Sequence, residues 1–166
     1  MSAESPRVAI CPGSYDPVTN GHVDIITRAS RIFDELIIGV VGQSIRKSDT
    51  LFDPEERVAF LEGATSHLDN VRVIAFSTLL VDFARENGAT TIVKGLRAIS
   101  DFEYEFEMNQ LNRKLAPEIE SAYVMASPEF SFLSSTGVKE LATFGGDVSD
   151  LVPPEVAAAL RERIER

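Results

Sequence analysis

The residues best suited to chemistry come directly after a short apolar run, in the segment from Pro12 to His22. Gly13 lets the backbone turn sharply and approach a ligand closely, and Ser14 adds a hydroxyl and a backbone N–H. Gly21 and His22 fall where a helix begins, and the unpaired N–H groups and dipole of a helix N-terminus favour an anion. A histidine there can donate a hydrogen bond to a phosphate oxygen. The segment therefore predicts phosphate binding, although it lacks the G-x-G-x-x-G dinucleotide fingerprint.

A second group of candidate residues is the run Lys94-Gly95-Leu96-Arg97, in which two cations flank a glycine after an apolar strand. Such a pair suits phosphate capture, because an arginine can chelate two phosphate oxygens. A surface turn with two solvated charges explains the same run, so both interpretations stay open on the residues alone. Acidic residues follow at 101–105, at the start of a long helix, where the helix dipole by itself accounts for them.

Hydroxyl groups gather in a third segment, Phe130-Ser131-Phe132-Leu133-Ser134-Ser135-Thr136, at the start of another helix. Serine and threonine are good N-caps, and the same hydroxyls and N–H groups can hold a triphosphate. A fourth segment, residues 42–51, carries the adjacent cations Arg46 and Lys47. Either a solvated basic pair or a cation that contacts phosphates fits this loop.

The elements that must position these four segments follow from the hydrophobic pattern. Apolar runs typical of buried strands lie at residues 8–11, 36–41, 71–76, 90–93 and 122–126. Helical patterns lie at residues 20–34, 54–67, 79–87, 101–115, 134–144 and 154–164. This alternation predicts an α/β fold, a single Rossmann-like, doubly wound, five-stranded parallel sheet with helices on both faces. Ligands bind such sheets beyond the carboxyl ends of the strands, where the four segments begin.

Length and composition limit the classes of protein that the chain can belong to. Its 166 residues with 44% hydrophobic content fit one domain, which we expect to span 7–166 after a disordered stretch at 1–6. The net charge of −10 argues against a nucleic-acid partner, but a pocket that binds small anions need not share the overall sign. The single cysteine, Cys11, excludes an internal disulfide, and no apolar run is long enough for a membrane span. We therefore expect a cytoplasmic protein with no membrane partner.

The four motifs together resemble those of the nucleotidylyltransferase superfamily. Its signature, (Thr/His)-x-Gly-His at the start of the first helix, is similar to Thr19-Asn20-Gly21-His22. Threonine in the first position, the Lys94–Arg97 block and Asp101-Phe102-Glu103-Tyr104-Glu105 are similar to the phosphopantetheine adenylyltransferase family. The motifs occur in the order of that family, and the resemblance runs from about Arg7 to the C-terminal helix.

The resemblance implies a nucleotidyltransferase of coenzyme A biosynthesis. Such an enzyme transfers the adenylyl group of ATP to 4′-phosphopantetheine and releases dephospho-CoA and pyrophosphate. The acceptor phosphate is already an anion, so it can attack in line with no general base and no covalent enzyme intermediate. No set of carboxylates or histidines has metal-ligand spacing, and Mg²⁺ is expected to arrive with ATP. The family is usually a homohexamer.

The resemblance also implies roles for individual residues. His22 would stabilise charge around the α-phosphate, Arg97 and the hydroxyl segment would hold the other phosphates, and Lys47 would bridge donor and acceptor. Arg46 fits this last role by its distance from the strand, whereas Lys47 preserves the residue type. The catalytic residues are then His22, Lys47, Arg97 and Ser135. The ATP-binding residues are Ser14, Tyr15, His22, Gly95, Leu96, Arg97, Glu105, Phe130, Ser131, Phe132, Leu133, Ser134, Ser135 and Thr136. The residues that bind the acceptor are Ser14, Lys47, Leu80 and Lys94.

Two other functions remain open on the sequence. One is a sister nucleotidylyltransferase with a different acceptor, such as nicotinamide mononucleotide, or with CTP as donor. The other is a non-catalytic module that binds ATP, because nothing in the motifs demands turnover. Release of pyrophosphate from ATP in the presence of a chosen acceptor separates all three functions.

Overall fold

The computed structural model describes residues 4–42 and 49–165, and within them five parallel strands form one sheet in the order β3-β2-β1-β4-β5. The strands are β1 (Val8–Gly13), β2 (Glu35–Val41), β3 (Val71–Phe76), β4 (Thr91–Leu96) and β5 (Glu120–Met125). The helices are α1 (Asn20–Ser30), α2 (Pro54–Thr65), α3 (Leu80–Glu86), α4 (Ile99–Leu115), α5 (Ser135–Thr143) and α6 (Pro154–Ile164), with a 3₁₀ turn η1 at Pro128–Phe130. The predicted five-stranded parallel α/β fold is confirmed.

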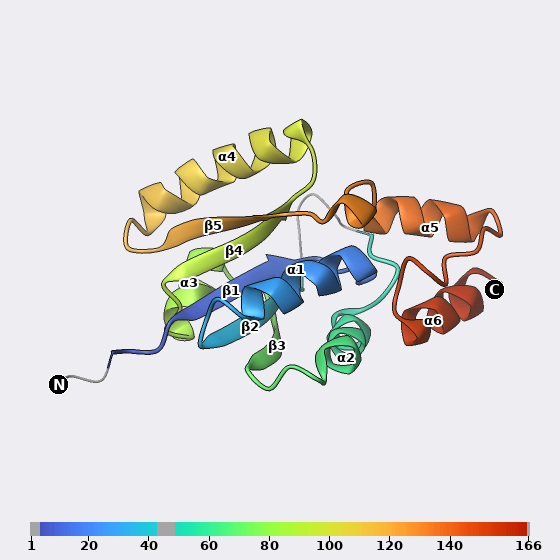
Figure 1. Ribbon diagram of the computed structural model, residues 1–166, viewed down its shortest axis with the longest axis horizontal. Coiled ribbons are helices and arrows are strands. Elements are labelled where there is room, and N and C mark those ends of the chain that lie inside the picture. The colour runs from blue at the N-terminus through green and yellow to red at the C-terminus, as the bar shows by residue number, and fades with distance from the viewer. Residues whose placement is uncertain (1–3, 43–48, 166) are drawn as a thin grey trace.

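Helices cover both faces of the sheet, as predicted (Figure 1). Neighbouring residues of a strand point to opposite faces, so Ala9 of β1 enters a different core from Ile10. Ala9 packs in the larger core, which α1, α2, α5 and α6 complete with side chains such as Leu61 and Leu160. Ile10 packs in the smaller core, to which α3 contributes Phe83.

The ends of α2 and α3 agree with their sequence signals. Asp53 caps α2: its carboxylate accepts from the Glu56 amide at 2.8 Å, while the Glu56 side chain accepts from the Asp53 amide at 3.0 Å. This reciprocal pair is a capping box, and Pro54 occupies the first helical turn. After α3, Gly88 adopts a positive φ of 67°, a conformation that favours glycine.

Several predicted boundaries are wrong. Pro12 and Gly13, expected in the first loop, belong to β1 and pair there with β2. The first helix ends at Ser30 rather than near residue 34, and Ile32, predicted to share its buried face, is 51% exposed. The reason is the start of β2, where the Arg7 backbone amide donates to the Asp34 carboxylate and draws the chain into the sheet. The fourth strand also runs further than predicted. Lys94 and Gly95, expected in the loop, pair with β5 as part of β4.

The order of the strands marks one edge of the sheet as the place for a ligand. From β1 the chain continues to β2 and β3 on one side, then crosses back to β4 and β5 on the other. The loops after β1 and β4 therefore leave neighbouring strands in opposite directions, which in doubly wound sheets opens a crevice at the carboxyl ends. Within residues 4–42 and 49–165, no helix combines the length and apolar character needed to cross a membrane.

The predicted disorder of residues 1–6 lies partly outside the described residues. Those that are described, 4–6, have no helix or strand and are exposed.

Candidate functional site

The beginning of α1 shows why threonine and histidine occur three residues apart. Thr19 is the N-cap, and its hydroxyl accepts from the backbone amide of His22 at 3.3 Å. In return the Thr19 amide donates to Nδ1 of the His22 ring at 3.0 Å, which completes a capping box. Because Nδ1 accepts a hydrogen bond, the proton of the neutral ring is assigned to Nε2. His22 is thus held as an Nε2–H donor in the first turn of a helix.

The hydroxyl segment lies against this helix start. Ser135 donates its hydroxyl to the Pro17 carbonyl at 2.7 Å, which joins the start of α5 to the β1–α1 loop. A Cβ atom at Gly21 would lie 3.4 Å from Cβ of Phe130, so this glycine permits close packing of the two segments. Ser134 caps α5 by accepting from the Gly137 amide at 3.0 Å, as the sequence predicted for a hydroxyl at this position.

Arg97 ties the end of β4 to the same hydroxyl segment. Its Nη1 donates to the Leu133 carbonyl at 2.6 Å, and its Nε pairs with the Asp101 carboxylate at 3.1 Å. The structure therefore brings the elements that carry His22, Arg97 and Ser135 together at the carboxyl edge of the sheet. The sequence-based prediction of a triphosphate cradle depends on these three residues being neighbours.

Lys94 and Glu105 form an ion pair with each other. Lys94 Nζ lies 2.8 Å from Glu105 Oε2, and both side chains are largely buried. The Lys94 ammonium also lies 5.6 Å from the centre of the Tyr104 ring. Two residues predicted to contact different substrates, the acceptor and ATP, are therefore direct neighbours on β4 and α4.

The Tyr15 side chain, predicted to contact ATP, points into the protein and is buried. Its hydroxyl donates to the Cys11 carbonyl at 2.9 Å, and burial raises the pKa of this phenol well above its ordinary value. The ring packs edge-on against His22, with centroids 5.0 Å apart. A Cβ at Gly13, the last residue of β1, would come within 3.0 Å of the Tyr15 ring, so a glycine here allows the tyrosine to fold inward.

The other predicted site residues are spread around the same edge or fall outside the described residues. Leu80 begins α3 and is half-buried, and Leu133 is buried. Phe132 is 73% exposed. Lys47 and Arg46 lie outside the described residues, so the structure says nothing of either one.

Sequence reasoning missed a buried ion pair under the first loop. Asp16 is buried and accepts from the backbone amides of Leu51 and Phe52, both at 2.9 Å, and from Lys139 Nζ at 2.9 Å. Burial alone raises the pKa of the Asp16 carboxyl, but the hydrogen bonds from Leu51, Lys139 and Phe52 outweigh it, so the pKa lies below its ordinary value. Asp16 and Lys139 are 123 positions apart in the sequence, which explains why no local pattern indicates the pair.

Arg57 was missed as well, although the sequence holds a signal for it. Its guanidinium is buried and donates to backbone carbonyls, among them that of Ser14 at 2.7 Å. Burial lowers the pKa of this guanidinium. Along α2, Arg57 is in line with Leu61 and Thr65, at spacings of four residues, and all three are buried. An arginine in the apolar stripe of a helix is the pattern that marks such a residue.

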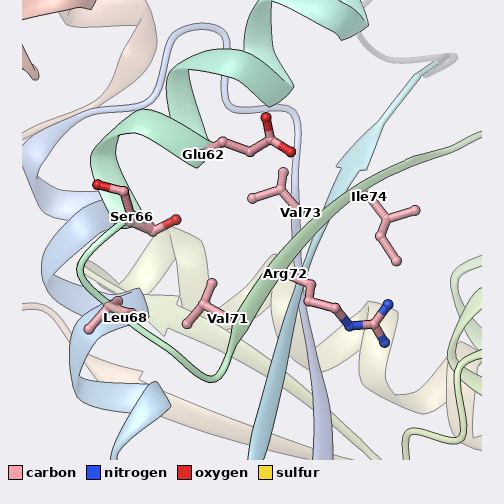
Figure 2. Close-up of a pocket in the computed structure, with 8 residues that line it drawn as sticks. Glu62, Ser66, Leu68, Val71, Arg72, Val73 and Ile74 are labelled. Atoms are coloured by element: carbon pink, nitrogen blue, oxygen red, sulfur yellow. The ribbon is translucent and has the colours of Figure 1, made fainter.

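Two hollows of the surface lie away from this edge. Figure 2 shows one of 390 Å³ between the end of α2 and the edge strand β3, with Glu62, Ser66 and Arg72 in its wall. Another, of 550 Å³, lies between α5 and α6. Neither is lined by a residue predicted to bind ATP or the acceptor. The candidate site is therefore defined by the contacts between the loops at the carboxyl edge of the sheet, such as those of Arg97 and Ser135.

Comparison with known proteins identifies relatives over nearly the whole chain. The model of the cytidylyltransferase-like family matches residues 10–141. A phosphopantetheine adenylyltransferase from Heliobacterium modesticaldum is 52% identical over 156 residues, which cover 94% of this chain and 92% of the relative.

Solved structures with a similar fold are more distant in sequence. One is a Vibrio parahaemolyticus protein described as a putative nicotinate-nucleotide adenylyltransferase. It matches with a TM-score of 0.69 at 18% identity, over 98% of this chain and 96% of its own. A bifunctional NMN adenylyltransferase/ADP ribose pyrophosphatase from Francisella tularensis matches with a TM-score of 0.69 at 16% identity, over 98% of this chain but only 51% of its own length. Identities this low establish a shared fold and nothing about the acceptor.

Proposed function

The chain belongs to the cytidylyltransferase-like family and, within it, to the phosphopantetheine adenylyltransferases, and on this premise we propose that it transfers the adenylyl group of ATP to 4′-phosphopantetheine. The products are dephospho-CoA and pyrophosphate. The observation that carries the proposal is the meeting of three loops at one edge of the sheet, where Ser135 contacts the first loop and Arg97 contacts the hydroxyl segment.

The reaction needs no covalent contribution from the protein. An oxygen of the acceptor phosphate forms a bond to the α-phosphorus, the bond from that phosphorus to the bridging oxygen breaks, and pyrophosphate leaves with the electron pair. The protein aligns the two phosphates and stabilises the charge that develops between them. His22 is suited to this task because the Thr19 amide fixes its ring as an Nε2–H donor.

The remaining groups fit the departing pyrophosphate. Arg97 is held by Leu133 and Asp101, so its guanidinium enters the reaction already oriented. Ser135 and Thr136 lie in the first turn of α5, where backbone amides and the helix dipole favour an anion. These groups bind anions rather than cations, and we propose that Mg²⁺ arrives as part of the substrate, on the phosphates of ATP. Lys47 or Arg46 would bridge donor and acceptor.

Release of pyrophosphate is the test of this function. The protein is incubated with ATP and one acceptor, and pyrophosphate is measured by a coupled assay. We expect release with 4′-phosphopantetheine, and only background release with nicotinamide mononucleotide, nicotinate mononucleotide or no acceptor. Equal release with a mononucleotide would assign the chain to a sister activity. Binding of ATP without release would make it a non-catalytic nucleotide-binding module.

We propose further that the protein is a cytoplasmic homohexamer. An exposed apolar surface supports self-association: α4, along the outer side of the molecule in Figure 1, leaves Phe102, Phe106, Leu111 and Leu115 about half exposed. Sedimentation velocity tests the number of chains, and a species of one chain at micromolar concentration would contradict the hexamer.

A further inference from the structure

Arg57 lies under the candidate site and joins three segments that are far apart in sequence. Its side chain is fully buried. Nη1 donates to the carbonyls of Ser14, at 2.7 Å, and Val41, at 2.9 Å. Nε donates to the carbonyl of Phe52 at 3.1 Å. One guanidinium thus connects the loop after β1, the last residue of β2 and the approach to α2.

Stability alone does not explain an arginine at this position. Its hydrogen-bond partners are neutral carbonyls, and Nη2 is buried with no hydrogen-bond partner among the residues that the structure describes. A buried charge loses its hydration, and an apolar side chain of similar volume often serves the fold equally well. What an apolar side chain lacks is a rigid planar fork of N–H donors, which fixes several acceptors relative to one another.

Asp16 also connects two of these three segments, the loop after β1 and the approach to α2. Its carboxylate accepts from the amides of Leu51 and Phe52. Phe52 is therefore held at its N–H by Asp16 and at its carbonyl by Arg57. Asp16 itself is two residues from Ser14, the other carbonyl that Arg57 holds. The β1–α1 loop is thus connected to residues 51–52 both directly, through Asp16, and through Arg57. Arg57 connects the same loop to the end of β2.

We propose that Arg57 is a positioning residue for adenylyl transfer. It holds Ser14 in register with the end of β2 and thereby sets the path of the loop that leads to the His22 donor. The inference rests on the proposed function, because it concerns the phosphate cradle of that reaction. Arg57 acts only through backbone carbonyls, since its own side chain is buried beneath them.

Two variants and a matched control test the proposal. Arg57→Met keeps much of the volume and removes every donor, whereas Arg57→Lys keeps the charge but cannot span three carbonyls. The control is Asn70→Leu, because the Asn70 amide also donates to two backbone carbonyls, those of Ser30 at 2.8 Å and Phe33 at 3.1 Å. Asn70 directly precedes β3, so these bonds lie at the opposite, amino edge of the sheet.

Steady-state release of pyrophosphate is measured at a temperature where circular dichroism shows each variant to be folded. We expect kcat to fall by ~10²-fold in Arg57→Met and by ~10-fold in Arg57→Lys, with a smaller change in KM for ATP, because misplacement of about 1 Å has such an effect. Asn70→Leu should lower Tm and leave kcat near the wild-type value. A folded Arg57→Met with wild-type kcat overturns the proposal, and if this variant does not fold, wild-type kcat in Arg57→Lys overturns it.

A binding measurement separates this inference from the proposed function. If the wild-type protein releases no pyrophosphate, the proposed function fails. Calorimetric titration with α,β-methylene-ATP then decides the role of Arg57. We expect weaker binding to Arg57→Met and Arg57→Lys and unchanged binding to Asn70→Leu. Equal affinity in all three variants would show that Arg57 does not shape the phosphate cradle.

Discussion

Substitution of His22 by alanine should affect two properties that the structure assigns to different nitrogens of the ring. Nδ1 accepts from the Thr19 amide at 3.0 Å, and Thr19 is only 1% exposed, so the ring is the group that satisfies this buried amide. A buried donor left without a partner costs about 1–3 kcal/mol. The Thr19 hydroxyl still caps the backbone amide of residue 22. We therefore expect His22→Ala to fold but to lose stability by this amount.

Loss of Nε2–H should affect catalysis rather than stability. Removal of one donor that stabilises transition-state charge lowers kcat by ~10²–10³. His22→Gln separates the two effects, because glutamine three residues after an N-cap can accept from the cap amide as in an ordinary capping box. We expect His22→Gln to keep most of the stability that His22→Ala loses, and to lose kcat by ~10² or more.

The two variants are compared by urea unfolding and by pyrophosphate release from ATP and 4′-phosphopantetheine. Near-normal turnover in folded His22→Ala would refute the catalytic role of the histidine. Equal losses of stability in the alanine and glutamine variants would instead refute the capping box as the reason for this spacing. Each outcome concerns one nitrogen of the ring, so the two conclusions do not depend on each other.

Two further predictions concern charged groups around the site. In Arg97→Lys the ammonium cannot reach Leu133 and Asp101 together. We expect kcat/KM for ATP to fall by ~10–100-fold, since a charge-assisted hydrogen bond contributes about 1.5–3 kcal/mol. An unchanged kcat/KM would exclude Arg97 from phosphate binding. The pKa of Asp16 is lowered in the folded protein, so its ionised form adds stability above the unfolded pKa, and this contribution disappears as pH falls through the folded pKa. Asp16→Asn should therefore flatten the acid side of the stability curve measured by urea unfolding between neutral pH and pH 3, and an unaltered slope would contradict the assignment.

Much of the fold and the location of the site could be predicted from local patterns. Runs such as Val71–Phe76 are strands because apolar, β-branched residues are continuous there, and the structure has this strand with the predicted bounds. The capping signal at Asp53 to Glu56 located the start of α2 for the same local reason. The loops at the carboxyl ends followed from the fold, since parallel strands place their following loops on one edge.

Other features depend on contacts that no local pattern contains. The orientation of Tyr15 depends on Cys11 inside the core, and the pairing of Lys94 with Glu105 depends on how α4 lies over β4. The capping role of His22 escaped prediction because the capping box is usually identified by glutamate or glutamine, and here an imidazole nitrogen takes their place.

The charge around the site explains how a chain with a net charge of −10 can bind a triphosphate. Within the described residues, three cations around the predicted cradle are matched by carboxylates: Lys94 by Glu105, Arg97 by Asp101, and Lys139 by Asp16. Arg57, buried beneath the first loop, donates to backbone carbonyls instead. The opposite charges of each pair largely cancel at a distance. The pairs therefore orient the side chains of the site more than they attract ATP. Among the described residues, we propose that the attraction comes from oriented N–H groups at the starts of α1 and α5, which carry partial positive charge whatever the net charge of the protein. The spacing of the T-x-G-H motif fits this role, because Thr19 and His22 satisfy one another's hydrogen-bonding groups and hold the first turn of α1 in place.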